Sequence, residues 1–312
     1  MNSSSLSSGE EPRGEKPPSG KLDAAAQAEF PRQVEAWRQS LELCSQKPSR
    51  KRVHSLRVAT LRLQAGLEHW LRTQEPDPPA ARAVKRWSEQ GKKLRRALRP
   101  VREADVYLSK LASLHAPSAV PEEGHLSLSP RCLRQIGKLE QRLTQKRQTA
   151  EKKLIAKLED RRERLDRLSR EMEAALAPPA PFRWGCSASE ISGLVADLAA
   201  EFSSLDSGNL HAFRKRIKKV RYLAGISAVP LPQTGRQAAL KRMQAAIGEW
   251  HDWHVLAEEA RREFRGRGKA GGLAQLLETL ASKSLKEALG VCQRSMAHLL
   301  KRRAKNGPSS RR

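Results

Sequence analysis

Apolar residues recur at helical spacing in a segment that begins near residue 53 of this 312-residue chain. The residues that share one face of such a helix are Leu56, Ala59, Leu63, Leu67 and Trp70. At about 100° per residue, His54 and Arg57 lie together on another face. The pattern therefore predicts an amphipathic helix that continues to about Arg72, with a buried back and a cationic front.

A second segment of the chain repeats this pattern. Its apolar stripe consists of Phe213, Ile217, Val220 and Ala224. Its polar side carries His211, Arg214, Lys215, Lys218, Lys219 and Arg221. Surface helices usually mix acidic and basic residues, because pairs one turn apart stabilise the helix. A face that carries only cations therefore points to a binding surface.

Another pair of segments repeats in the same order. Residues 92–106 align with residues 241–255, including the acidic positions Glu103 and Asp252. In each of the two pairs, the second copy follows the first at a similar distance along the chain. We therefore expect an internal repeat, with two halves that have the same order of helices and are related by an approximate two-fold axis.

Breaks between the periodic segments divide the chain. We expect a disordered tail at residues 1–25 and an N-terminal helical half at 26–177. A Pro-rich linker at 178–186 should lead to a C-terminal helical half at 187–305, which a basic tail follows at 306–312. The first helix is expected at residues 34–44 only. Ser129-Pro130 and the capping box Ser187–Glu190 are expected to begin helices. Pro100 is expected to break or kink its helix, and the long helical run 131–176 to bend near Asp160.

The composition favours helices and a polyanionic partner. The chain has 60 Lys and Arg against 34 Asp and Glu, and only 4% aromatic residues. A net charge of +26 repels itself in the compact state, and a polyanion would neutralise it. Nucleic acid, inorganic polyphosphate and an anionic membrane surface are the partners that this charge permits.

The remaining features predict a soluble cytoplasmic protein. Cys44, Cys132, Cys186 and Cys292 are widely separated, as expected of buried reduced thiols rather than of a disulfide framework or a CxxC metal site. The first residues lack the apolar stretch of a secretion signal. The longest uncharged run, residues 222–235, is too short to span a membrane.

The repeated motifs resemble those of the CHAD domain, the conserved histidine α-helical domain. The matching motifs are His54-x-x-Arg57, His211-x-x-Arg214 and the segments 101–106 and 248–255. The resemblance covers about residues 30–305. It implies an all-α fold of two four-helix bundles that binds inorganic polyphosphate, without catalysis or cofactor, on the basic surface between them. Binding of such a polymeric anion would in turn localise the protein to polyphosphate granules. The chain departs from the family pattern at Leu61, Gln64, Arg99 and Glu103, where the family usually has Arg, Arg, Gly and Asp.

We expect a basic groove at the junction of the halves. Its predicted residues are His54, Arg57, Arg62, Lys92, Arg96, Arg102, His211, Arg214, Lys215, Lys218, Lys219, Arg221 and Lys241. Rows of arginines suit phosphate because the planar guanidinium donates two hydrogen bonds to one phosphate group. Glu103 and Asp252 are expected to orient basic residues of other helices through ion pairs.

The alternatives are nucleic-acid binding and enzymatic activity. Binders of single-stranded nucleic acid usually place aromatic residues within a basic groove, whereas Trp70 and Trp87 fall on predicted core faces and only Tyr222 lies near a basic stripe. His251 and His254 could share a zinc ion, but they lack further ligands at suitable spacing. No Gly-rich phosphate loop is present either, so we expect neither a metal site nor catalysis.

Overall fold

The computed structural model describes residues 19–115, 128–177, 184–201, 205–226, 235–265 and 272–305. Within these ranges every regular element is an α-helix, which confirms the predicted all-α fold. The helices are α1 (Ser19–Gln46), α2 (Arg50–Thr73), α3 (Pro78–His115), α4 (Pro130–Ala175), α5 (Ala188–Glu201), α6 (Leu210–Ala224), α7 (Arg236–Glu263) and α8 (Leu273–Lys305).

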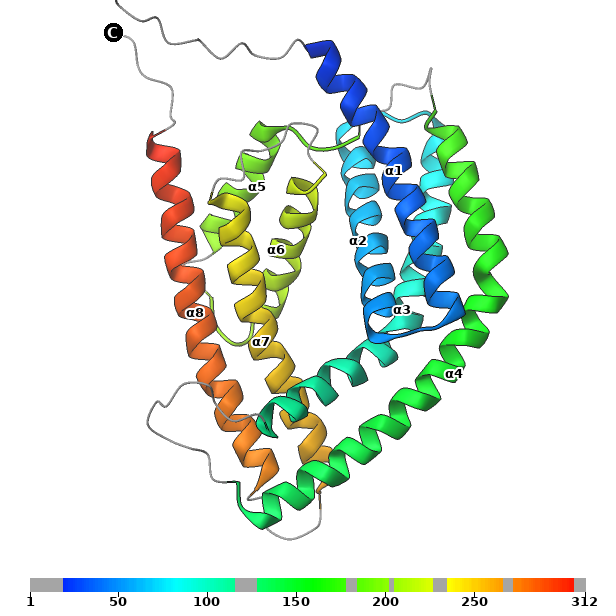
Figure 1. Cartoon of the computed structure of the whole chain (residues 1–312). Helices are drawn as coiled ribbons and strands as arrows, with labels where there is room; N and C mark the ends of the chain where they lie inside the picture. Colours follow the sequence, from blue (N-terminus) through cyan, green and yellow to red (C-terminus); the bar gives the residue numbers. More distant parts are fainter. Residues whose placement is uncertain are drawn as a thin grey trace, which may run out of the picture.

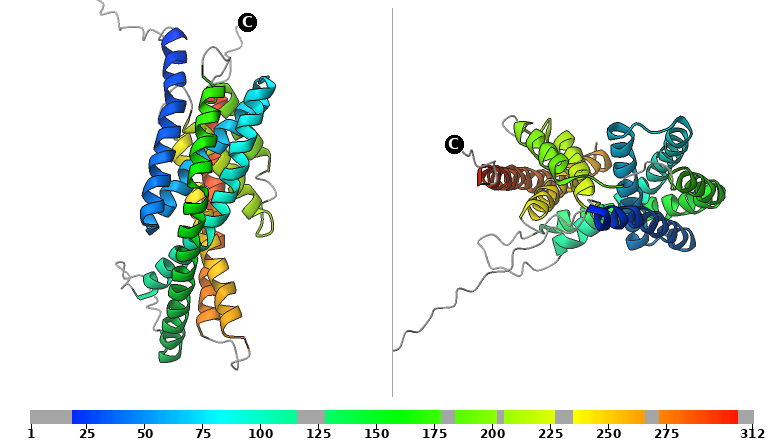
Figure 2. Two further views of the ribbon diagram at one scale, coloured as in Figure 1. Left: turned by 90° about the vertical axis from the view of Figure 1, so that its right-hand side faces the viewer. Right: turned by 90° about the horizontal axis from the view of Figure 1, so that it is seen from above.

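The helices lie in two groups that follow the order of the chain. Helices α1–α4 form an N-terminal group and α5–α8 a C-terminal group, which are separate in the upper part of Figure 1 and in the view from above in Figure 2. The groups contact each other through α2 and α6, through α3 and α7, and through α4 and α8. The two-fold relation between the groups remains a prediction, which superposition of His54 on His211 would test.

The predicted apolar stripes of α2 and α6 are buried. Leu56, Leu63, Leu67 and Trp70 of α2 lie in the core, and Ala59 is half-buried against it. In α6 the buried residues include Phe213, Ile217, Val220 and Ala224. Burial of such a large apolar side chain contributes about 1.5–3 kcal/mol. Each helix is therefore held by its back, and its polar front is left for other contacts.

Two long helices are continuous where the sequence suggested an interruption. Pro100 lies inside α3, which changes direction along its course in Figure 1 but does not break. The residues on either side of the kink, Leu98 and Val101, are fully buried, and this packing offsets the lost backbone hydrogen bond. Helix α4 runs past Asp160 as one element. The helix changes direction along its course in Figure 1, in agreement with the predicted bend, and its buried stripe continues through Leu158 and Leu165.

The ends of several segments differ from their predicted positions. Helix α1 begins at Ser19, well before the predicted helix and inside the segment expected to be disordered. The Ala-rich sequence of residues 21–28 favours this extension. The prolines of the predicted linker, and the tails 1–18 and 306–312, lie outside the described residues. At the end of the linker, Trp184 and Cys186 are buried in the core.

The predicted caps are present. The Ser129 hydroxyl accepts a hydrogen bond from the Cys132 N–H at the start of α4. At the start of α5 the Ser187 N–H donates to Glu190 Oε2 at 2.7 Å, and the Glu190 N–H donates to Ser187 Oγ at 3.2 Å. All four cysteines are buried and free, as predicted.

Candidate functional site

The contact between the two helix groups encloses a cavity of about 490 Å³, here called the central cavity. Helices α2, α3, α6 and α7 line it. Its charged and histidine residues are Arg57, Glu68, Arg95, Arg99, Arg102, Glu103, His211, Arg214, Lys215, Lys218, Lys219 and His251. The others are Leu61, Gln64, Ala65 and Tyr222. Each cationic helix turns its apolar back to its own group, so the polar fronts meet at the junction.

Positive charge dominates this cavity. Eight Lys and Arg residues face two carboxylates, Glu68 and Glu103. Glu103 is engaged by Arg99 of the same helix, whose Nε lies 2.6 Å from the carboxylate. We had expected Glu103 to orient a cation of another helix, but the pair forms within α3. The cavity thus retains a large excess of positive charge.

Several of these cations have no acidic partner. Among the described residues, no carboxylate lies within 4.0 Å of the charged groups of Arg57, Arg95, Arg102, Arg214 or Lys218. The Nε atoms of Arg95 and Arg214 are buried and have no hydrogen-bond acceptor in the described part of the chain. An unsatisfied buried donor is costly. The arrangement is therefore one that an anion would stabilise.

Lys218 is the cation most affected by its surroundings. Burial, together with repulsion from Arg214 and Arg57, lowers the pKa of its ammonium group to about 7. Asp252 of α7 acts in the opposite direction. Burial also raises the pKa of Asp252, while Arg214, Lys110 and Arg102 lower it. No ion pair of Asp252 within 4.0 Å occurs among the described residues, so the expected direct pair is absent.

The histidines of the cavity are disposed to be neutral. The rings of His211 and His251 lie 4.8 Å apart. Burial lowers the pKa of His251 to about 4, with added repulsion from Arg214 and His211. Burial and nearby cations likewise lower the pKa of His211. A neutral imidazole can still donate one hydrogen bond to an anion.

The structure brings together only part of the predicted set. The predicted residues that line the central cavity are Arg57, Arg102, His211, Arg214, Lys215, Lys218 and Lys219. His54 is exposed but close enough to Arg102, Arg57 and Lys218 for its pKa to be lowered by them.

The other predicted residues lie elsewhere. Arg62, Arg221 and Lys241 line a neighbouring cavity of about 690 Å³, which shares Tyr222 with the central one. Arg96 lines a third cavity of about 770 Å³, which shares Arg99 and Glu103 with it. Lys92 is exposed on α3 and lines none of these three cavities.

Three basic residues of the central cavity were not predicted. Arg95 and Arg99 stand one helical turn apart, and Arg102 follows one turn later. That spacing could have identified them, since they continue one stripe. Besides Arg95 and Arg99, the third unpredicted residue is His251, which we had considered from the sequence only as a possible zinc ligand. His254, its expected co-ligand, instead stacks on Trp250 with ring centroids 5.7 Å apart.

Leu61 and Gln64, the two departures from the family pattern on α2, both line the central cavity. The Gln64 Nε2 donates to the Ser88 carbonyl at 2.7 Å and so ties α2 to α3. Helix α2 consequently contributes one cation to the cavity, Arg57, which donates to the Arg95 carbonyl at 3.3 Å.

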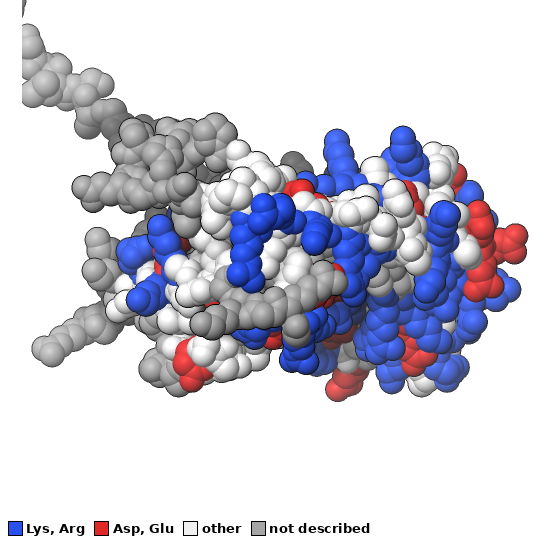
Figure 3. Space-filling view, turned by 90° about the horizontal axis from the view of Figure 1, so that it is seen from below, with Lys and Arg blue, Asp and Glu red and all other residues white. Residues whose placement is uncertain are grey.

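Basic side chains also cover a wide outer surface. In Figure 3, Lys and Arg side chains gather on the side of the N-terminal group, with scattered acidic side chains between them. The third cavity lies between α3, α4 and α7, and its cations include Arg142, Lys146, Lys153, Lys157 and Arg262. Cationic surface therefore continues from the central cavity across α3.

The fold and the cavity define an all-helical protein with a cationic cavity at the contact of two helix groups. The chain belongs to the CHAD domain family, whose model matches residues 28–261. A comparison with curated protein sequences finds no match.

Two solved structures share the fold. PptA from Streptomyces chartreusis matches with a TM-score of 0.64 and 14% identity, over 91% of this chain and 100% of that one. The CHAD domain from the plant Ricinus communis matches with a TM-score of 0.52 and 18% identity, over 92% of this chain and 88% of that one. None of the helices among the described residues has both the length and the apolar character needed to cross a membrane.

Proposed function

We propose that this protein binds inorganic polyphosphate, without catalysing a reaction, in the central cavity. The observation that carries the proposal is the group of partly buried cations without acidic partners, including Arg95 and Arg214 with their unpaired Nε donors. Guanidinium groups bind phosphate oxygens through charge-assisted hydrogen bonds, which are about twice as strong as neutral ones. Family membership supports the same ligand class, because the resemblance to CHAD domains implies polyphosphate.

A linear polymer suits the arrangement better than a small anion. The central cavity shares Tyr222 with the cavity that contains Arg62, Arg221 and Lys241. It also shares Arg99 with the cavity beside α4. A chain of phosphates that passes through the central cavity would meet cations at both ends. We therefore expect affinity to rise with chain length until the polymer spans all three cavities.

Nucleic acid is the second candidate, and the lining residues favour it less. Tyr222 is the one Phe, Tyr or Trp residue among those that line the central cavity, and its side chain is buried, with Arg221 5.0 Å from its ring. Binding of single strands usually depends on exposed aromatic rings that stack on bases. Here the donors suit phosphate groups and offer little for bases.

A competition experiment tests the proposal. Labelled long-chain polyphosphate bound to the protein is challenged with unlabelled polyphosphate, single-stranded DNA, duplex DNA and RNA at physiological salt, at equal phosphate concentration. We expect unlabelled polyphosphate to displace the labelled polymer best. Its affinity should fall steeply as the salt concentration rises, because binding releases the counterions that surround the polyphosphate. Better displacement by nucleic acid, or an affinity that salt does not change, would contradict the proposal. Association with polyphosphate granules is a further expectation, which a fluorescent fusion in cells would test.

A further inference from the structure

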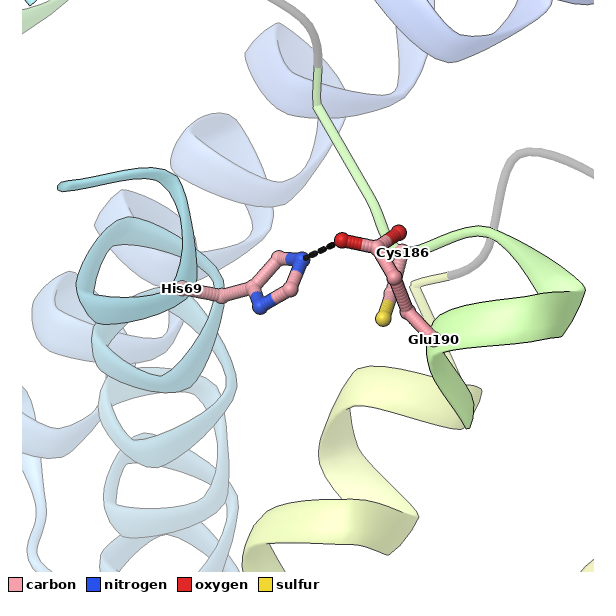
Figure 4. Close-up of side chains that lie close together, drawn as sticks. All are labelled: His69, Cys186 and Glu190. Atoms are coloured by element: carbon pink, nitrogen blue, oxygen red, sulfur yellow. Dashed lines mark ion pairs between the residues drawn. The ribbon is translucent and has the colours of Figure 1, made fainter. Parts of the chain in front are cut away.

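A cluster of three metal-capable side chains lies at another point of contact between the helix groups. His69 belongs to α2, Cys186 precedes α5, and Glu190 lies in the first turn of α5. Figure 4 shows the three side chains pointing toward one another. One ligand atom of each lies within 4.8 Å of the others. The sequence did not indicate this cluster, because His69 and Cys186 are far apart in the chain.

The segment that carries Cys186 is firmly packed against α2. The Trp184 indole lies so close to Gly66 that a Cβ there would come within 2.2 Å of the ring. Its ring centroid is 5.0 Å from that of Phe30 on α1. Only glycine at position 66 allows this approach, so the backbone next to Cys186 is held beside His69 before any ligand binds.

The three side chains already interact. His69 Nε2 lies 3.2 Å from Glu190 Oε1, and the Cys186 thiol is hydrogen-bonded to the same carboxylate. Glu190 Oε2 accepts the Ser187 N–H of the capping box, which fixes the orientation of the carboxylate. The side chains of His69 and Glu190 are 8% and 39% exposed. The cluster is therefore mostly enclosed but open on the Glu190 side.

We propose that His69, Cys186 and Glu190 form a zinc site that joins the two helix groups. Imidazole nitrogen, thiolate sulfur and carboxylate oxygen are the usual ligands of Zn²⁺, at about 2.0–2.3 Å, and three of them leave a fourth position for water. Ligand atoms at those distances from one ion lie closer together than 4.8 Å, so the three side chains draw together when the ion binds. Softness of the thiolate favours zinc over magnesium or calcium.

Proton balance predicts how binding depends on pH. A cysteine binds zinc as the thiolate, so the Cys186 thiol must lose its proton when the metal binds. When zinc binds, the S–H bond breaks, a sulfur–zinc bond forms, and one proton leaves to solvent. The imidazole of His69 binds metal in its neutral form, through a nitrogen lone pair. Zinc affinity should therefore increase with pH.

The test uses the full-length protein, stripped of metals and kept reduced, without polyphosphate. It is titrated with Zn²⁺ alone, followed by calorimetry, and with Co²⁺ alone, followed by absorption. We expect one ion per chain, a thiolate-to-cobalt charge-transfer band in the near ultraviolet, and a higher thermal unfolding temperature with zinc. Absence of stoichiometric binding by the wild-type protein would overturn the proposal whatever the variants do.

Variants assign the bound ion to the cluster. Cys186→Ser should lose the charge-transfer band and more than about tenfold in zinc affinity, and His69→Gln should also bind more than about tenfold more weakly. Matched controls are Cys132→Ser, another buried thiol, and His251→Gln, a histidine of the central cavity. Both controls should bind zinc as the wild type does. A band that survives Cys186→Ser, or that disappears in Cys132→Ser, would show that the site is elsewhere. Circular dichroism confirms that each variant is folded.

Discussion

The two sides of the central cavity carry the same number of cations but use different residues. The N-terminal group contributes four arginines, Arg57, Arg95, Arg99 and Arg102. The C-terminal group contributes Arg214 and three lysines, Lys215, Lys218 and Lys219. One side takes its charge mostly from α3 and the other from α6 alone.

Because of this difference, the attraction of the site for an anion and the pH dependence of that attraction come from different residues. Arginine stays protonated at any pH of interest, whereas a buried lysine shifts its pKa readily. The pKa of Lys218 is lowered to about 7, so the charge of the C-terminal side changes near neutral pH while that of the N-terminal side does not. We therefore expect the α3 arginines to provide constant attraction, and α6 to provide most of the pH dependence.

The largest expected effect comes from removing two cations of α6. Arg214→Ala combined with Lys218→Ala should weaken polyphosphate binding by about 100-fold or more, since each charge-assisted contact contributes about 1.5–3 kcal/mol. Both residues line the central cavity and neither belongs to the buried apolar stripe. Titration of the wild type and of the double variant with polyphosphate, at one salt concentration, measures the loss of affinity.

The matched comparison on α2 is Arg57→Ala combined with Arg62→Ala. Its loss should be smaller, because Arg62 lines the neighbouring cavity rather than the central one. Circular dichroism serves as the folding control, and both variants should remain helical because alanine is a good helix former. A larger loss from the α2 pair would show that α6 is not the stronger contributor.

A gain of binding is the next largest effect. Leu61 lines the central cavity where Arg is usual in the family, so Leu61→Arg should strengthen binding by roughly tenfold through one added charge-assisted contact. Leu43→Arg, at an exposed position of α1, adds the same net charge away from the cavity. If both variants gain equally, net charge and not position determines affinity.

The pH dependence should be of intermediate size. As pH rises through about 7, Lys218 loses its proton and polyphosphate affinity should fall, by at most about tenfold per pH unit. Lys218→Arg keeps the charge at every pH and should flatten the profile. Subtracting its profile from that of the wild type also removes the titration of polyphosphate itself. If the wild type and Lys218→Arg show parallel profiles of affinity against pH, the pH dependence comes from a group other than Lys218.

The smallest effect is expected outside the cavities. Lys92→Ala should weaken binding by about twofold or less, because an exposed charge is screened by salt. Lys215→Ala removes an equally exposed lysine that lines the central cavity, and it should cost more. Equal losses in a side-by-side titration would mean that the polymer follows the general surface charge.

The helices, their buried faces and the cationic fronts of α2 and α6 could be predicted from the sequence alone. Period and capping are local properties, and neighbouring residues determine them. The buried stripes through Leu56 and Phe213 and the capping box at Ser187 were therefore predicted correctly. The same local reasoning placed the start of α1 too late, because it gave too little weight to the Ala-rich residues 21–28.

Only the tertiary structure decided which cations share a cavity. A cationic helix front is wide, and the rotation of the helix against its neighbours selects the strip that faces a given cavity. Arg221 therefore faces one cavity and Lys218 another, although both belong to α6. Contacts between distant segments likewise bring His69 to Cys186. Helix period determines which residues share a face, but the packing of the helices against one another determines what that face meets.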